Sequence, residues 1–153
     1  MDKKAFKKKV MEQAIKYQEA IVSDFRTRIR ELREGEQQSQ DDKYEYDQQG
    51  QEDESAIVIN RIADELNFVV EELDFLKQMQ TADNLFDEVT LGAVVKTDQM
   101  TFFPSVSIEK FEVEGKELFG ISQKAPIYKE MKGKKKGESF TLNGRTYRIL
   151  DVF

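Results

Sequence analysis

Two apolar stripes with helical spacing dominate the first half of the chain. The first stripe consists of Phe6, Val10, Ala14, Tyr17, Ile21, Phe25, Ile29 and Leu32. The second consists of Ile59, Ile62, Leu66, Val69, Leu73 and Leu76, at alternating steps of three and four residues. Such spacing places apolar side chains on one face of a helix, and in the second stripe it forms a heptad seam. Two seams of similar length predict a long antiparallel coiled-coil hairpin over residues 1–80.

The polar segment between the two stripes is expected to hold the turn of the hairpin. Residues 33–55 contain six glutamines and nine acidic residues against two basic residues, Arg33 and Lys43. The midpoint between the stripes lies near residue 45. We therefore place the tip at residues 41–47, which read Asp-Asp-Lys-Tyr-Glu-Tyr-Asp.

A change in composition near residues 81–90 predicts a linker and then a second domain over residues 91–153. Both prolines and six of the eight glycines follow this point. Residues rich in β-branched and aromatic side chains predict strands at 92–97, 101–103, 106–113, 117–121, 139–142 and 147–152. Pro126 is expected to open a short helix, and Asn143-Gly144 to form a tight hairpin turn. The predicted fold class is α+β, a helical hairpin followed by a small antiparallel β domain with one short helix.

The composition excludes several kinds of chemistry. The chain has no cysteine and no histidine, so thiolate zinc sites, cysteine nucleophiles and histidine bases are absent. Its net charge of -6 argues against a general nucleic-acid-binding surface. No apolar run approaches the roughly 20 residues that a membrane-spanning helix needs. We therefore expect a cytoplasmic protein without membrane contact, in which any catalytic group is Asp, Glu, Lys or Tyr.

The second domain carries a sequence that resembles a known family. Residues 121–138 read Ile-Ser-Gln-Lys-Ala-Pro-Ile-Tyr-Lys-Glu-Met-Lys-Gly-Lys-Lys-Lys-Gly-Glu, and residues 147–152 read Tyr-Arg-Ile-Leu-Asp-Val. Both segments resemble the signature of the Gre transcript-cleavage factors of bacteria. In that family an Ile-Ser strand end is followed by a proline-initiated helix, a Gly-Lys-Lys-x-Gly loop and a final hairpin. Gre factors also have an N-terminal coiled-coil hairpin, and the resemblance implies that residues 91–153 are FKBP-like.

The resemblance implies a role in transcription elongation through binding to RNA polymerase. The hairpin would enter the secondary channel of the polymerase and place its tip near the 3′ end of the nascent RNA. Carboxylates at the tip would then help to hold a magnesium ion that promotes cleavage of backtracked RNA, since Mg²⁺ prefers carboxylate oxygens. Two alignments with the family's tip motif both retain Asp42 and Glu45, which we expect to serve as the catalytic and metal-binding residues. On this reading the chain is an accessory factor of the polymerase active site and not an enzyme.

Two further segments are candidates for contact with the polymerase. The family docks through the loop before the short helix, which by position implicates Lys124, Ala125, Pro126 and Ile127. Alternatively, Pro126 and Ile127 only cap and bury the helix. The basic run at residues 132–136 could meet an acidic polymerase surface or RNA, or remain a solvated loop.

The tip departs from the family and leaves other functions open. The usual Gly-Asp-Leu-x-Glu-Asn-Ala-Glu-Tyr motif is missing from residues 33–55. One alternative is therefore a secondary-channel-binding regulator without cleavage activity. Another is a coiled-coil interaction protein that binds a helical partner and never meets a polymerase. The sequence gives no indication of an obligate oligomer.

Overall fold

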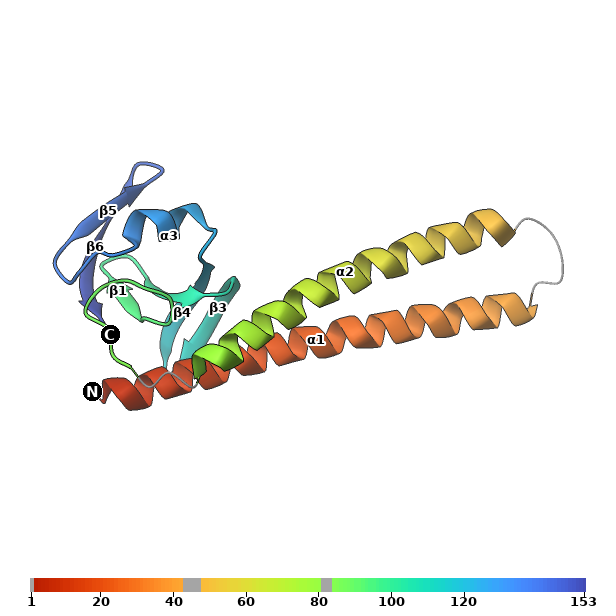
Figure 1. Cartoon of the computed structure of the whole chain (residues 1–153), viewed down its shortest axis with the longest axis horizontal. Coiled ribbons are helices and arrows are strands. Elements are labelled where there is room, and N and C mark those ends of the chain that lie inside the picture. The colour runs from red at the N-terminus through yellow and green to blue at the C-terminus, as the bar shows by residue number, and fades with distance from the viewer. Residues whose placement is uncertain (1, 43–47, 81–83) are drawn as a thin grey trace. The chain divides into compact units, whose positions relative to one another are not determined.

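The computed structural model describes residues 2–42, 48–80 and 84–153, and the side chains of residues 2–35, 54–80 and 84–153. Two long helices come first, α1 (Lys3–Asp42) and α2 (Gln48–Gln80) (Figure 1). The remaining elements are β1 (Val95–Thr97), β2 (Thr101–Ser105), β3 (Ile108–Val113), β4 (Lys116–Ser122), α3 (Pro126–Met131), β5 (Ser139–Leu142) and β6 (Arg145–Val152). A helical hairpin followed by a β domain with one short helix confirms the predicted α+β class.

The chain divides into two compact units. The first, here called the β unit, combines Met1–Tyr17 with Phe75–Phe153. The second, the hairpin unit, is Gln18–Asp74. Both long helices contribute residues to both units, because each helix crosses a unit boundary.

The hairpin unit is held by two apolar seams close to the predicted ones, with Val22 buried and the predicted Ile21 half-buried. Here α1 and α2 run antiparallel and side by side (Figure 1). Val22 and Ile29 on α1 and Ile59 and Leu73 on α2 are buried, while most of the charged residues between them are exposed. Apolar side chains that recur on one face drive the helices together, since this face alone is removed from water.

The β unit contains a six-stranded mixed sheet in the order β3-β4-β2-β1-β6-β5. Four of the strand pairs are antiparallel, but β2 and β4 pair in parallel, with Phe102 opposite Phe119. The expected antiparallel sheet is therefore wrong for this pair. After β2 the chain crosses to the edge of the sheet and forms β3 there. It then turns back as β4, which lies between β3 and β2 and runs parallel to β2.

Gly120 on β4 makes this arrangement possible. A Cβ atom at this position would lie 2.6 Å from the Val106 carbonyl oxygen and 2.8 Å from Cβ of Ile108. Real Cβ atoms do not approach other atoms so closely, and the nearest atom belongs to the backbone. The connection between β2 and β3 can therefore pass over β4 only at a glycine.

Two tight hairpin turns form, one of them at Asn143-Gly144 as predicted. Glu114 and Gly115 join β3 to β4, and Asn143 and Gly144 join β5 to β6. All four residues have positive φ angles, between 52° and 78°. Two successive positive φ values match the right-handed twist of the flanking strands, which explains the preference for Asn-Gly.

One core cluster of the β unit includes residues of α3 and of the sheet. It comprises Val89, Ala93, Val95, Phe102, Tyr128, Met131, Phe140, Tyr147, Ile149 and Val152. Phe140 and Tyr147 are opposite each other on β5 and β6, and their rings stack with centroids 5.0 Å apart. Burial of these large side chains fixes α3 against the sheet and positions the loops at both of its ends.

The first turns of α1 pack against the β domain within the same unit. The Phe6 ring lies 6.1 Å from the ring of Phe153, and the Lys3 ammonium is 3.0 Å from an Asp151 carboxylate oxygen. Lys9 pairs with Glu114 in the β3–β4 turn, and this hydrogen bond raises the pKa of the Lys9 ammonium. The start of α1 is thereby attached to the last strand and to one hairpin.

Candidate functional site

The two long helices lead to the predicted tip. α1 continues to Asp42 and α2 begins at Gln48, and residues 43–47 lie outside the described residues. The side chain of Asp42 and the whole of Glu45 lie outside the described residues. Their assignment as a magnesium-binding pair stays a prediction.

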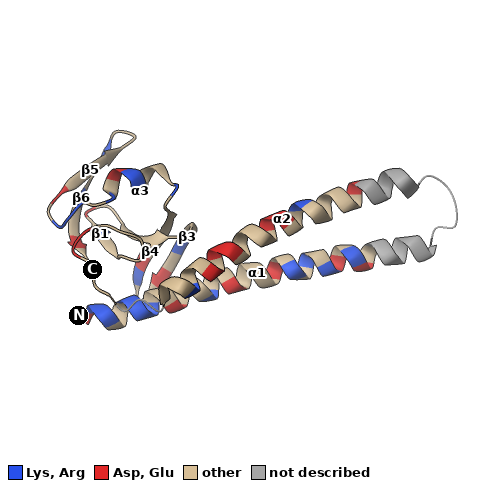
Figure 2. Ribbon diagram, viewed as in Figure 1, with Lys and Arg blue, Asp and Glu red and all other residues tan. Residues whose placement is uncertain are grey.

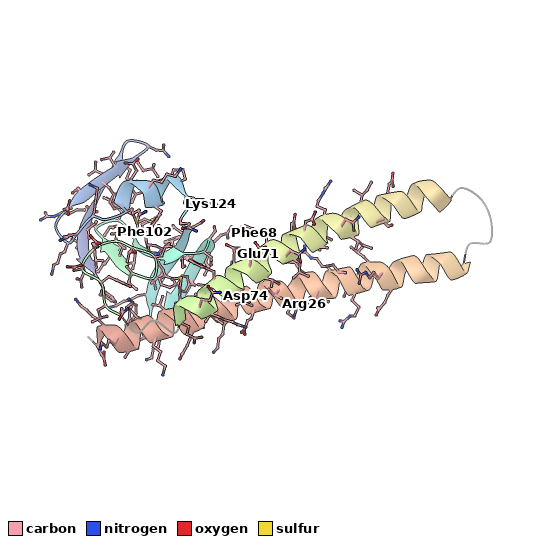
Figure 3. The ribbon with its side chains drawn as sticks, viewed as in Figure 1. Arg26, Phe68, Glu71, Asp74, Phe102 and Lys124 are labelled. Atoms are coloured by element: carbon pink, nitrogen blue, oxygen red, sulfur yellow. The ribbon has the colours of Figure 1, made fainter. Side chains whose placement is uncertain are left out.

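The two described arms of the hairpin unit differ in charge pattern, since arginines alternate with acidic residues on α1 whereas α2 is mostly acidic. On α1, exposed arginines follow one another at positions 26, 28, 30 and 33. On α2, exposed carboxylates cluster nearer its C-terminal end, at Asp64, Glu65, Glu71 and Asp74 (Figures 2 and 3). Most of the outer face is charged, but Ile57, Val58 and Phe68 on α2 are exposed apolar side chains.

One exposed aromatic residue interrupts the acidic face of α2. Phe68 is 58% exposed and lies on the same helix as Glu71 (Figure 3). Scattered exposed apolar residues are common on protein surfaces. Phe68 therefore defines no site by itself.

Among the described side chains of the hairpin unit, one polar residue is buried in the seam. Gln18 is 1% exposed, and its side-chain amide donates to an oxygen of Glu72 at 3.4 Å. A polar side chain within an apolar seam favours the one register in which it finds its partner. The register in turn sets which residues of the two arms meet at the tip.

The predicted docking loop connects β4 to α3. The Ala125 amide donates to the Ser122 carbonyl at 2.9 Å, and the Lys124 amide donates to the Ser122 hydroxyl at 3.2 Å. Ala125 has an extended backbone with ψ of 138°, and Pro126 then takes the first helical position. Proline suits this position because its fixed φ is helical and it has no N–H to leave unpaired.

The side chains of this loop divide between solvent and core. Lys124 and Pro126 are exposed, whereas Ile127 is half-buried and packs against the core of the β unit. Ile127 therefore anchors α3, as the capping interpretation predicts for this residue, while Lys124 and Pro126 are accessible to solvent. Their contact with a polymerase stays a prediction.

Tyr128 is a buried residue of α3 and belongs to the core of the β unit. Its ring is 4% exposed. Burial raises the pKa of the Tyr128 phenol, and a hydrogen bond with Thr90 opposes part of that increase. The neutral phenol is therefore the form that the fold stabilises.

The lysine-rich loop after α3 is held by its backbone. The Gly133 amide donates to the Val89 carbonyl at 2.9 Å, and the Val89 amide donates to the Lys134 carbonyl at 2.8 Å. Gly133 and Gly137 have φ angles of 78° and 91°, which glycine adopts without strain. Lys132, Lys135 and Lys136 are exposed on this fixed backbone.

Sequence reasoning missed a groove that forms within the β unit. Its walls come from the start of α1, the end of α2, residues 84–92 and Phe103. These segments are far apart in the chain, so no local pattern indicates the groove. The one available signal was the lysine-rich start of α1, with Lys4 and Lys8 one turn apart.

Within the described parts of the chain, no group of three or more Asp, Glu, Cys or His residues is placed to hold a metal ion. Among the same residues, no helix is both long and apolar enough to cross a bilayer.

The fold of this chain is similar to that of a solved structure. The chain resembles the crystal structure of GreA factor homolog 1 from Thermus thermophilus at 16% sequence identity. The match covers 91% of this chain and 94% of that one, with a TM-score of 0.35. A scan against protein-family models and a search of curated protein sequences find no match.

Proposed function

We propose that this chain is a Gre-like transcription elongation factor that acts on bacterial RNA polymerase through its secondary channel. One observation carries the proposal. The segment that resembles the Gre signature folds as β4, α3, a glycine-bounded lysine loop and the β5–β6 hairpin. In the sequence it follows a two-helix hairpin. Each turn of the signature thus has a structural reason in this chain, including Pro126 at the helix start and Gly133 at its end.

The dimensions of the hairpin suit this role. At about 1.5 Å per residue, the 40-residue α1 is roughly 60 Å long. A helix of this length can carry a tip from the surface of a large enzyme to an active site deep inside it. The register held by Gln18 would keep the two arms aligned at the tip.

The proposed chemistry is metal-assisted hydrolysis at the polymerase active site. Asp42 and Glu45 would supply oxygen ligands to a second magnesium ion, whose other ligands are water and polymerase carboxylates. Two metal ions about 4 Å apart can stabilise both the attacking and the leaving oxygen atoms of a phosphodiester. The factor would thus act without a complete metal site of its own, as an accessory to the polymerase.

The β unit would hold the factor at the channel entrance. Lys124 and Pro126 are exposed beside the start of α3 and would contact the polymerase surface. Ile127 would act indirectly, because it fixes the loop against the core.

A second candidate function is a regulator that occupies the channel without stimulating cleavage. The observation that favours it is the missing family motif at residues 33–55. Such a protein would bind the polymerase through the same surfaces and compete with cleavage factors. Asp42 and Glu45 would then contribute solubility or charge and not metal affinity.

The decisive experiment uses backtracked elongation complexes of a bacterial RNA polymerase with magnesium, followed by shortening of the RNA from its 3′ end. The proposal expects cleavage that the double variant Asp42→Asn with Glu45→Gln removes while binding persists. A matched control is Glu31→Gln with Glu34→Gln, which neutralises two exposed carboxylates at the same spacing on α1. This control should cleave normally.

Other outcomes separate the alternatives. Binding and competition with a known cleavage factor, without RNA shortening, would identify the non-cleaving regulator. No binding to polymerase, together with capture of a different helical protein, would establish an interaction protein outside transcription.

A further inference from the structure

The groove in the β unit has the size and lining of a small-molecule site. Its volume is about 470 Å³, within the usual range of roughly 300–1,000 Å³ for ligand pockets. The floor and walls include Met11, Met79, Phe86, Leu91 and Phe103. Aromatic rings and methionine side chains accommodate an apolar body of varied shape, because the thioether chains adjust easily.

One edge of the groove is positively charged. Lys4, Lys7 and Lys8 line it from successive turns of α1, and none of the described lining residues is Asp or Glu. The nearby Asp2 carboxylate accepts from the Ala5 amide at 3.2 Å and caps the helix. The chain as a whole has a net charge of -6, so this positively charged edge is a local feature.

The three lysines do not have the same role. Lys7 donates to the Asn84 carbonyl at 2.6 Å and lies 4.4 Å from the centre of the Phe86 ring, so it holds the wall in place. Lys4 and Lys8 are exposed and lie one helical turn apart on the same face. These two ammonium groups are available to a ligand.

We propose that this groove binds a small amphiphilic anion that is free in solution. Its apolar or aromatic body would lie against Met79, Phe86 and Phe103, and its carboxylate, sulfonate or phosphate would face Lys4 and Lys8. Leu85 is 45% exposed at the groove and would be covered by the bound molecule. The inference is independent of the proposed function, since it uses neither the tip nor the docking loop.

Binding would join elements that are distant in sequence. The walls belong to α1, to the end of α2 and to the segment that enters the sheet. A ligand that contacts all three favours the folded β unit over the unfolded chain, and the stabilisation grows with ligand concentration. Saturation should therefore raise the melting temperature of the full-length protein.

A matched pair of fluorescent probes tests the proposal. The first is 1-anilinonaphthalene-8-sulfonate, and the second is N-phenyl-1-naphthylamine, which has the same rings without the sulfonate. Full-length protein should bind one equivalent of each with a fluorescence increase. The double variant Lys4→Glu with Lys8→Glu should weaken binding of the sulfonate about tenfold and change binding of the neutral probe by less than about twofold.

Further variants locate the binding at the groove. Leu85→Ser should weaken both probes, because it removes apolar contact without disturbing a buried core. Lys16→Glu changes an exposed lysine of α1 that does not line the groove, and Phe68→Ser removes the exposed aromatic residue of the hairpin unit. Neither change should alter the affinity for either probe.

Three results would overturn the proposal. The first is binding without a saturable single equivalent, and the second is equal loss of sulfonate affinity in Lys16→Glu and in the double variant. The third is loss of binding in Phe68→Ser. If the double variant with glutamate unfolds, Lys4→Gln with Lys8→Gln replaces it, with the same expected selectivity for the sulfonate.

Discussion

The β unit and the hairpin unit differ in how much they bury. Of the twelve largest fully buried side chains, only Gln18 belongs to the described part of the hairpin unit. The β unit supplies the others, among them Phe103, Leu118, Met131 and Ile149. A three-dimensional core therefore stabilises the β unit, whereas the hairpin unit depends on helix formation and on one seam. A pair of helices must expose most of its surface, so a single seam is all the burial that it can have.

The largest expected change in the free energy of unfolding is for a Phe→Ala substitution in the β unit, which is compared with the same substitution in the hairpin unit. Phe103→Ala opens a cavity at a residue that is 1% exposed and packs against Phe111, with ring centres 6.5 Å apart. It should lower the free energy of unfolding by about 4 kcal/mol. Phe68→Ala in the hairpin unit removes a ring that is 58% exposed and should change it by less than about 0.5 kcal/mol. Urea unfolding measures both values, and similar losses would contradict the difference in burial.

A smaller and more local loss is expected within the seam. Ile59→Ala removes a side chain that is 7% exposed and should destabilise the hairpin unit by about 2 kcal/mol. Hydrogen exchange should accelerate in residues 54–74 and not in β1 to β6. Ile57→Ala is the control, because Ile57 is 57% exposed two residues away. Equal acceleration in the sheet would show that the two units unfold together.

Gln18 is expected to lower the stability of the hairpin unit while it favours a single register of the two arms. Gln18→Leu replaces a buried amide by an apolar side chain of similar size, so it should raise the stability of the hairpin unit by about 1 kcal/mol. Without the amide, more than one alignment of the arms becomes favourable. Spin labels at two exposed positions, Arg26 and Glu71, should then give a broader distance distribution than in the unchanged chain. A single sharp distance would mean that the apolar seam alone sets the register.

The hairpin and the tight turns could be predicted because their signals are local. The seams from Phe6 and from Ile59 repeat with the helical period, and Asn143-Gly144 specifies its turn without distant partners. The parallel pairing of β2 with β4 could not be predicted, since it depends on where β3 lies. The requirement for Gly120 becomes visible only when the Val106 carbonyl is known to lie above it.

The candidate site shows the same division between local and distant signals. The loop from Lys124 to Ile127 takes the conformation that Pro126 dictates, and its position beside α3 followed from the sequence. The groove could not be foreseen, because Met11, Met79 and Phe103 converge only in the folded chain. Asp42 and Glu45 rest on the resemblance of the sequence alone, because they lie where side chains are not described.

The smallest expected effect is a pH dependence of the free energy of unfolding that Tyr128 of α3 causes. Burial raises the pKa of Tyr128 above its ordinary value near 10, so the unfolded chain loses this proton first as pH rises. The stability that the neutral phenol contributes is complete below about pH 10 and is lost as pH rises through the higher pKa of the folded state. Tyr128→Phe removes this titration, at a cost of about 1 kcal/mol at pH 8 for the hydrogen bond with Thr90. The difference in unfolding free energy between the unchanged chain and Tyr128→Phe should therefore shrink from pH 8 to pH 11. Thr90→Val removes the hydrogen bond and keeps the phenol, so it should retain the alkaline loss; if Tyr128→Phe retains it as well, other groups cause it.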